Sequence, residues 1–440
     1  MGSADEDSPA RVRRRGWRRA RPDRRSRGRL AAGRLVQPPD LDRQRPSLHQ
    51  SSLPWDVARE LAHAVATPLR PRSVVLAEAD GTTLAVPLVA SAAVPPVDRS
   101  AMDGYAVRGP GPWRLVGTIR AGSGLAPELE DGQAYKIVTG AAVPTGTTAV
   151  LPDEEAIRSE DDVAGSAIPG RHIRRAGEEC AAGEVLLPAG VVVDPSVLGL
   201  AATLGLNRLT VLPRPRVAAF VTGDELVHAG ASGPGRVRDA IGPMVPGLVH
   251  RAGGCSSPAE VRHLEDSRQA LVDALASADA ELILVSGSSA SGPADHLRSA
   301  LAELGAELIV DGVACRPGHP QALARFEDGR LVLGLPGNPL AALTAFLTLG
   351  VAALRRLRGL GLPPLPICSV PGGLQSHPHS TRLVPVRVTA EGAVPVGHGG
   401  SAMLRGAAAA DAFAVVPPGP STAVAVRLLA LDPGAGPWVG

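Results

Sequence analysis

Hydrophobic positions along the chain change their spacing several times, and each change predicts a different kind of element. Between Trp55 and Ala62 apolar residues recur with helical spacing and have polar residues on either side, which predicts an amphipathic helix. From Trp113 to Pro169 apolar residues alternate in short runs that glycines interrupt. That second pattern is typical of a small β domain. Mixed structure follows, with an apolar helix expected around 195–204.

Residues 215–355 repeat a different pattern three times. Strand-like runs are expected at 217–221, 281–285 and 331–333, and each is followed by a loop rich in glycine or polar residues. Helices are expected after the second and third loops, at 294–304 and from 339 onward. Strand, loop and helix in repetition predict a doubly wound α/β domain, in which ligands bind beyond the carboxyl ends of the strands.

These patterns predict a multidomain protein of the α/β plus β class, as expected for 440 residues. The doubly wound α/β domain is expected to accompany two small β-rich domains and a mixed linking domain. The predicted boundaries are a disordered arm at 1–50, a discontinuous linking domain at 51–96 and 171–212, a β domain at 97–170, the α/β domain at 213–360 and a C-terminal β domain at 361–440.

Charge is distributed unevenly along this chain. The net charge is +2, yet residues 1–50 hold fourteen arginines against six acidic residues. The arm lacks apolar periodicity, so it is interpreted as disordered. It has no apolar segment of the kind that a secretory signal needs. The rest of the chain has more acidic than basic residues, which does not favour a nucleic-acid-binding surface.

Cysteine spacing and the longest apolar run point to a soluble, cytoplasmic protein. The four cysteines are far apart and form no CxxC motif, which argues against zinc ribbons and disulfide scaffolds. The run from Leu340 to Leu354 is short for a membrane span and suits a buried helix. His377 and His379 have no third metal ligand nearby in the sequence and are interpreted as loop histidines.

Three loops of the α/β domain have the composition of phosphate-binding sites. The small residues of 286–292 leave backbone N–H groups accessible, and Pro293 suits the first position of the next helix. Asp295 either caps that helix or holds a metal ion. A second cradle is expected at 334–339, with Asn338 as N-cap. Between these loops, a turn carries Arg316 and His319. The candidate phosphate ligands are Gly287, Ser288, Gly292, Arg316, His319, Pro336 and Pro339.

Carboxylates lie beside these cradles and would repel a phosphate unless a divalent cation stood between them. Mg²⁺ is the natural ion, because it prefers oxygen ligands and keeps waters for phosphate. Asp103 is presented on a tight turn after Pro95 and Pro96, together with Ser100. The candidate magnesium ligands are Asp103, Glu225, Asp239 and Asp295. The sequence therefore predicts a phosphoanhydride site.

Several segments resemble signatures of the molybdopterin molybdenumtransferases, the family that includes the C-terminal domain of gephyrin. The resemblance covers about 53–430, and the matching segments occur in the family's order. They are Ser100 to Ala106 (SAMDGYA), Ile137 to Gly146, Arg174 to Glu179, Thr222 to Leu226 (TGDEL), Gly334 to Pro339 (GLPGNP) and Ser401 to Leu404.

The resemblance implies four domains and an elongated homodimer, with the active cleft between the α/β domain of one subunit and the first two domains of the other. It also implies that adenylylated molybdopterin and molybdate are bound with Mg²⁺, AMP leaves, and molybdenum cofactor forms. Thr139 and Ser401 join Ser100 and the phosphate ligands as expected substrate-binding residues. Asp103, Glu225, Asp239 and Asp295 are the expected catalytic and metal-binding residues.

The chain departs from the family pattern at several of these sites. Ala240 and Ile241 replace two polar residues after Asp239, and Ser288 and Ala290 alter the glycine-rich loop. Arg316 and His319 replace lysines. Two alternatives therefore stay open beside the enzyme: a non-catalytic paralogue that binds pterin or acts as a scaffold, and a molybdopterin adenylyltransferase. The first 170 residues argue against the latter, which needs only the α/β domain.

Overall fold

A computed structural model describes residues 52–124, 127–256, 260–287 and 296–434. The Arg-rich arm lies outside them, as do Ser288, Gly292 and Asp295. The described residues form three six-stranded sheets and several smaller ones. The mixture of α/β and β-rich parts is the fold class that the sequence predicts.

The linking region draws its core from two separate stretches of the chain. Its buried residues lie between Val74 and Ala90 and again between Cys180 and Val211. Helix α2 begins cleanly because the Asp194 carboxylate accepts a 2.9 Å hydrogen bond from the Val197 N–H and Pro195 occupies its first position. The elements are β1 (Arg72–Val75), η2 (Leu76–Glu78), β2 (Thr83–Leu84), β3 (Leu88–Val89), β12 (Val185–Leu187), α2 (Pro195–Thr203) and β13 (Arg208–Leu212).

The first β-rich part is a six-stranded sheet that buries residues on both faces. Tyr105 and Val107 pack with Trp113 on one face, while Ala106 packs with Ile137 on the other. Glycine at position 104 allows the strand that contains Leu151 to pack closely, because a Cβ on Gly104 would lie 2.1 Å from the Leu151 carbonyl oxygen. In spatial order the strands are β8 (Ala149–Pro152), β5 (Gly104–Val107), β7 (Gln133–Ile137), β6 (Trp113–Ile119), β10 (Asp162–Ala164) and β9 (Ile157–Arg158). Beside it lie β4 (Arg99–Ser100), β11 (Ile173–Arg174) and η3 (Asp153–Glu155).

The α/β part is a sheet of four parallel strands continued by two more, of which β21 is antiparallel to both neighbours. In spatial order the strands are β17 (Val261–Leu264), β14 (Val217–Thr222), β18 (Leu282–Ser286), β22 (Leu331–Leu335), β21 (Ala322–Arg325) and β19 (Glu307–Asp311). Alternate residues of β18 face opposite cores: Ile283 packs in one cluster and Leu284 in the other.

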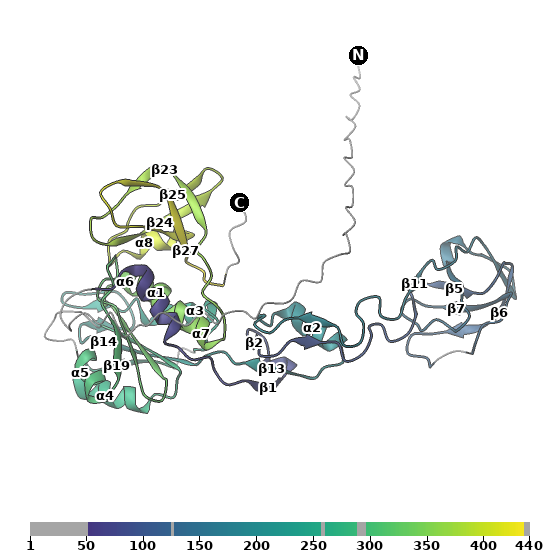
Figure 1. Cartoon of the computed structure of the whole chain (residues 1–440), viewed down its shortest axis with the longest axis horizontal. Helices are drawn as coiled ribbons and strands as arrows, with labels where there is room; N and C mark the ends of the chain where they lie inside the picture. Colours follow the sequence, from purple (N-terminus) through teal and green to yellow (C-terminus); the bar gives the residue numbers. More distant parts are fainter. Residues whose placement is uncertain (1–51, 125–126, 257–259, 288–295, 435–440) are drawn as a thin grey trace, which may run out of the picture. The chain divides into compact units, whose positions relative to one another are not determined.

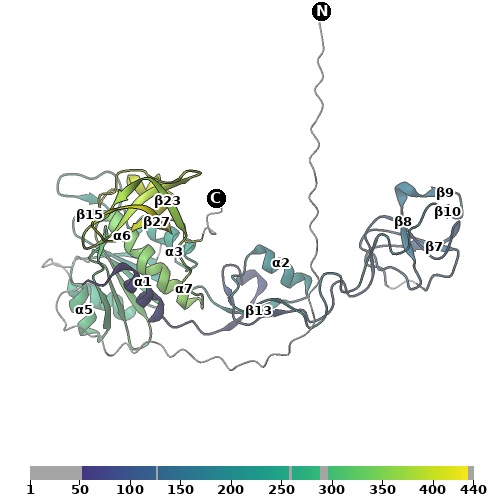
Figure 2. The same ribbon diagram turned by 45° about the horizontal axis from the view of Figure 1, so that its top comes forward.

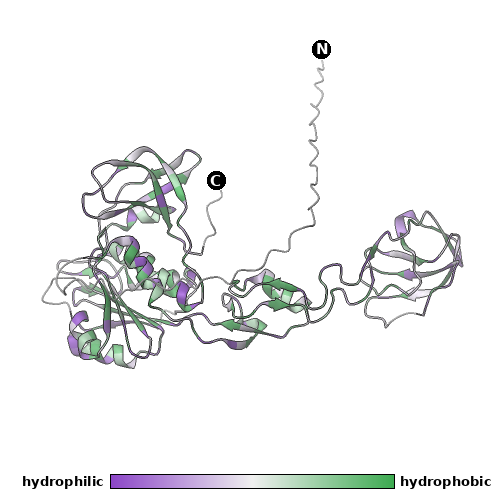
Figure 3. Ribbon diagram, viewed as in Figure 1, coloured by the Kyte–Doolittle hydropathy of each residue, from purple (hydrophilic) through white to green (hydrophobic). Residues whose placement is uncertain are grey.

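Helices cover both faces of this sheet (Figure 1), which confirms the doubly wound arrangement. They are α3 (Val245–Arg251), α4 (Arg268–Ser277), α5 (Leu297–Glu303), α6 (Pro339–Ala345) and α7 (Val351–Leu357), with η4 (Gly242–Met244) before α3. The flanking helices carry both hydrophilic and hydrophobic residues (Figure 3), as expected when one side of a helix packs on a sheet.

Helix α1 (Trp55–Ala64) belongs to this same core, although the sequence analysis placed it in the linking domain. Trp55, Ala58 and Ala62 are buried with the residues of α7, and α1 lies beside α7 in both ribbon views (Figures 1 and 2). The Trp55 indole N–H donates to the Thr348 hydroxyl at 3.0 Å. A helical periodicity shows which side of a helix is apolar but not which sheet receives it.

The apolar run that sequence analysis assigned to a buried helix is one continuous helical segment, 339–357. A π-helical turn, η6 (Phe346–Gly350), separates α6 from α7. Among the described residues, this is one helix with the length and composition to cross a membrane, and most of it is buried inside the protein. Its buried residues belong to the core of the α/β part.

The C-terminal β part is joined to the α/β part by a short strand, β20 (Cys315–Arg316), which pairs in parallel with β24 (Thr381–Thr389). Phe413 and Val415 point into the core shared with α6, whereas Ala412 and Ala414 face a separate small core. The remaining elements are β23 (Ile367–Gln375), β25 (Gly392–Pro395), α8 (Leu404–Ala408), β26 (Ala412–Val416) and β27 (Thr422–Ala430).

Candidate functional site

The carboxyl ends of β14, β18 and β22 meet at a cavity of about 810 Å³, which we name the acidic pocket. Thr222 ends β14, Ser286 ends β18, and Gly337 follows β22, so all three predicted loops contribute to it. Parallel strands place these ends on one edge of the sheet, where ligands of doubly wound proteins bind. The pocket is further lined by Gly223, Glu225, Arg238, Asp239, Ala240, Ile241, Asp266, Gly287, Asn338, Pro339 and Ala402.

Gly287 allows the strand ends to approach one another. Its φ is +99°, and an added Cβ would lie 2.3 Å from the Thr222 hydroxyl oxygen. That hydroxyl donates a 3.0 Å hydrogen bond to the Ser286 carbonyl, which fixes β14 against β18 at the edge of the cavity. Only glycine adopts such a backbone without strain and without filling the gap.

Glu225 and Asp266 line this pocket, and Asp224 contacts Asp266 beside it. The Asp266 N–H donates to the Asp224 carboxylate at 3.3 Å. The pKa of Asp266 is raised, chiefly because burial disfavours its charge and then because Asp224 and Glu225 repel it, although His296 acts in the opposite direction. Closely spaced oxygen donors under mutual repulsion suit a hard cation such as Mg²⁺. The sequence did not predict Asp266 as a site residue, because it follows an edge strand, β17, that lacks a regular pattern of apolar residues.

Asp239 is buried and already has hydrogen-bond partners. Its Oδ1 accepts from the Ile241 and Gly242 N–H groups at 2.9 and 3.0 Å, and its Oδ2 lies 2.9 Å from His263 Nε2. Burial raises the pKa of Asp239, but these hydrogen bonds outweigh it, so the pKa is lower than usual. The carboxylate therefore shapes its own turn as well as lining the pocket.

Arg238 lines the acidic pocket and has one unsatisfied hydrogen-bond donor. Its Nη1 is buried and has no hydrogen-bond partner among the described residues, while its backbone N–H is held by the Ser232 hydroxyl at 3.1 Å. A buried guanidinium N–H without an acceptor is costly.

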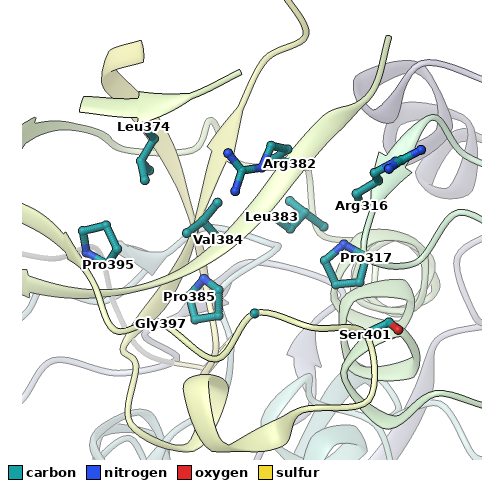
Figure 4. A pocket seen from close by; sticks show the side chains of 11 residues that line it. Arg316, Pro317, Leu374, Arg382, Leu383, Val384, Pro385, Pro395, Gly397 and Ser401 are labelled. Carbon is teal, nitrogen blue, oxygen red and sulfur yellow. The ribbon is translucent and has the colours of Figure 1, made fainter. Parts of the chain in front are cut away.

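A second cavity, of about 500 Å³, has the opposite charge, and we name it the basic pocket (Figure 4). Arg316 of β20 and Arg382 of β24 are among its lining residues (Figure 4). The pKa of nearby His377 is lowered by partial desolvation and then by these two arginines and His379. The other lining residues are Pro317, Leu374, Leu383, Val384, Pro385, Pro395, Gly397, Gly399 and Ser401.

One loop connects the two pockets. Ser401 lines the basic pocket and Ala402 the acidic pocket. The Ser401 carbonyl accepts a 3.1 Å hydrogen bond from the Ala341 N–H in the first turn of α6. This turn was predicted to cradle an anion, but Pro339 has no N–H and Ala341 is engaged. Asn338 does precede the helix, but its side chain makes no capping hydrogen bond. Pro336 is buried.

Other predicted residues line neither pocket of this chain. The Asp103 carboxylate instead accepts two hydrogen bonds from Thr139, one from its N–H at 2.6 Å and one from its hydroxyl at 2.9 Å. These hydrogen bonds lower the pKa of Asp103. Ser100 is 2% exposed and donates to the Met102 carbonyl at 2.6 Å, so its hydroxyl stabilises its own turn. His319 lies 2.7 Å from the Ser52 hydroxyl.

Comparison with known proteins gives matches along most of the chain. Residues 53–205 match the MoeA N-terminal region (domain I and II), residues 218–356 a probable molybdopterin-binding domain, and residues 370–425 the MoeA C-terminal region (domain IV).

Curated relatives and one solved structure agree with these matches. Molybdopterin molybdenumtransferase 2 of Mycobacterium tuberculosis is 38% identical over 319 residues, which span 68% of this chain and 78% of the relative. The molybdopterin molybdenumtransferase of Staphylococcus epidermidis is 31% identical over 65% of this chain and 71% of its own length. A molybdopterin biosynthesis MoeA protein from Pyrococcus horikoshii superposes with a TM-score of 0.71 at 26% identity, over 87% of this chain and 99% of that one.

Proposed function

The chain belongs to the molybdopterin molybdenumtransferase family, enzymes that insert molybdenum into molybdopterin, and we propose that it uses adenylylated molybdopterin and molybdate and releases AMP. The reaction builds molybdenum cofactor, and the metal is delivered as molybdate, a substrate. The observation that carries the proposal is the junction of an acidic and a basic pocket at Ser401 and Ala402.

The basic pocket suits the phosphate groups of the substrate. Arg316 and Arg382 both line it, and guanidinium groups grip phosphate oxygens with two parallel hydrogen bonds. The apolar side chains of Leu374, Leu383 and Val384 offer a surface for a flat ring. We assign these residues the task of binding and orienting the phosphate-bearing part.

The acidic pocket suits a magnesium ion and the reacting end of the substrate. Glu225 and Asp266 would hold Mg²⁺ with Asp224 nearby, because their repulsion is relieved by a cation. The bound ion would supply positive charge that offsets the charge of the phosphoanhydride. The orphaned Arg238 Nη1 would donate to an anionic oxygen. Asp295, predicted as a further ligand, lies outside the described residues.

We further propose that the active enzyme is a homodimer, in which Asp103 and Thr139 of one subunit complete the cleft of the other. Asp103 and Thr139 form an ordered pair on the turn before β5 and after β7, yet they line neither pocket of their own chain. We place the reaction in the cytoplasm, in keeping with four cysteines that are free thiols.

The test is AMP release by the purified full-length protein given adenylylated molybdopterin, molybdate and Mg²⁺. We expect turnover that requires both molybdate and Mg²⁺, and that is unchanged in Asp273→Asn, an exposed acid of α4 that lines neither pocket. Binding of the substrate without AMP release would instead identify a non-catalytic paralogue that retains the fold.

A further inference from the structure

Two histidines and an aspartate lie close together beside the acidic pocket. The sequence does not predict a common role for them. They are His228, Asp239 and His263, and their potential ligand atoms all lie within 4.8 Å of one another. They come from three segments of the chain: His228 follows β15 (Leu226–Val227), Asp239 follows β16 (Val237–Arg238), and His263 belongs to the edge strand β17.

The contacts within this cluster bring nitrogen and oxygen donors close together. Asp239 Oδ2 lies 2.9 Å from His263 Nε2, and the ring centroids of His228 and His263 are 3.6 Å apart at an angle of 42°. Asp239 is buried, whereas both histidines are exposed and can be reached by an ion from solvent. An ordinary Asp–His hydrogen bond accounts for two of these residues but not for the position of His228.

We propose that His228, Asp239 and His263 form a binding site for a divalent transition-metal ion of the zinc class. Two imidazole nitrogens and one carboxylate oxygen are a donor set that zinc accepts readily, whereas magnesium prefers oxygen ligands alone. This site is therefore chemically distinct from the magnesium site proposed at Glu225 and Asp266. Three protein ligands leave one coordination position open for water or an anionic oxygen.

The site has a direct structural consequence for the acidic pocket. β15 and β16 pair with each other through Leu226–Val237 and Val227–Arg238 and form a two-stranded sheet separate from the six-stranded sheet that contains β17. A metal on the three ligands would fasten the segment that carries Glu225 to β17, three residues before Asp266. The ion would thus hold in place both carboxylates that are proposed to bind magnesium.

The experiment measures zinc binding by the full-length protein after removal of bound metal. Zn²⁺ is titrated in competition with a chromophoric chelator, and Co²⁺ is used in parallel because its visible absorption reports the coordination geometry of the bound ion. We expect one tight site per chain. His228→Ala should weaken it by about 10–100-fold or more, because even the loss of a group that only orients a ligand costs that much.

Two further variants keep the result interpretable. His379→Ala removes a histidine from the exposed pair with His377 and should leave the tight site intact. His228→Ala leaves Asp239 paired with His263, so its fold should be retained, whereas His263→Gln tests the second nitrogen ligand. Zn²⁺ should raise the melting temperature of the wild type and of His379→Ala but not of His228→Ala.

Equal zinc affinity in the wild type and His228→Ala, or no tight site in the wild type, would overturn the proposal. The measurement needs no substrate, so it stands whether or not the protein releases AMP. If the protein binds zinc at this site but does not release AMP, the proposed function is wrong and the zinc-site proposal still holds.

Discussion

The acidic and basic pockets differ in how the chain builds them. The acidic pocket is made of backbone turns at the carboxyl ends of parallel strands, with carboxylates added from the following loops. The basic pocket is made of side chains on regular strands, β20 and β24, that join two parts of the protein. The acidic pocket therefore suits a cation, whereas the basic pocket suits an anion. A ligand that carries both a phosphate and a metal-binding group needs both pockets.

Removing a carboxylate from the acidic pocket should have the largest effect on turnover. Glu225→Gln keeps the shape of the side chain but removes its charge, so we expect kcat for AMP release to fall about 100-fold or more. ADP serves as a probe because it joins a phosphoanhydride to adenosine. Its binding in the absence of Mg²⁺ should change little in this variant, because the substitution leaves the basic pocket unchanged. Steady-state kinetics with Asp273→Asn as the control would check this, and a fall in both variants would contradict a specific role.

Filling the gap between strand ends should impair both stability and activity. Gly287→Ala places a methyl group 2.3 Å from the Thr222 hydroxyl in a backbone with φ of +99°, and we expect a loss of about 1–3 kcal/mol in unfolding free energy. Gly337→Ala is the matched control, because its Cβ would make an ordinary 3.8 Å contact with Gly287. Denaturant unfolding of both variants measures the difference. Equal losses would refute the close approach at Gly287.

Changes in the basic pocket should weaken binding more than they slow the chemistry. Arg382→Ala removes a charged hydrogen-bond donor from the phosphate, and we expect the Kd for ADP to rise about 10-fold or more. Arg316→Ala should behave similarly, and Arg316→Lys should restore only part of the affinity, since lysine cannot bind two oxygens in a fork. Calorimetric titration gives these values. A variant with unchanged Kd would place the phosphate elsewhere.

The smallest effect concerns the charge of Asp266, which burial disfavours first and repulsion by Asp224 and Glu225 disfavours further. The pKa of Asp266 is raised above its ordinary 3.8, so its contribution to stability is full below that value and is lost as pH rises through the higher folded-state pKa. Asp266→Asn should therefore raise the melting temperature of the metal-free protein at neutral pH, by about one or two degrees. Thermal unfolding at pH 7 and pH 3 tests this, and a gain of the same size at both would argue against a penalty for the charged form of Asp266.

The sequence predicted the parts of this site that depend on local chain geometry. Thr222, Gly287 and Gly337 stand at strand ends because runs such as Leu331 to Leu333 are apolar and the residues after them are small or polar. Their convergence follows from parallel strand order alone. The same reasoning located the loops without any knowledge of side-chain orientation.

Orientation and long-range pairing could not be read from the sequence. Ser100 and Ser401 are both serines in short turns, yet one hydroxyl is buried in its own turn and the other residue lines a pocket. Asp266 was missed because Arg262 and His263 interrupt the apolar pattern of β17, as solvent permits on an edge strand. Arg382 was missed because nothing local indicates that β24 pairs with β20.

The most direct test of the two-pocket account is the coupling between Mg²⁺ and ADP, which joins a phosphoanhydride to adenosine. The account predicts that saturating Mg²⁺ tightens ADP binding by about 5-fold or more, that ADP tightens Mg²⁺ binding by the same factor, and that Glu225→Gln abolishes this coupling without loss of metal-free ADP affinity. Independent binding of the two ligands in the wild type would contradict it.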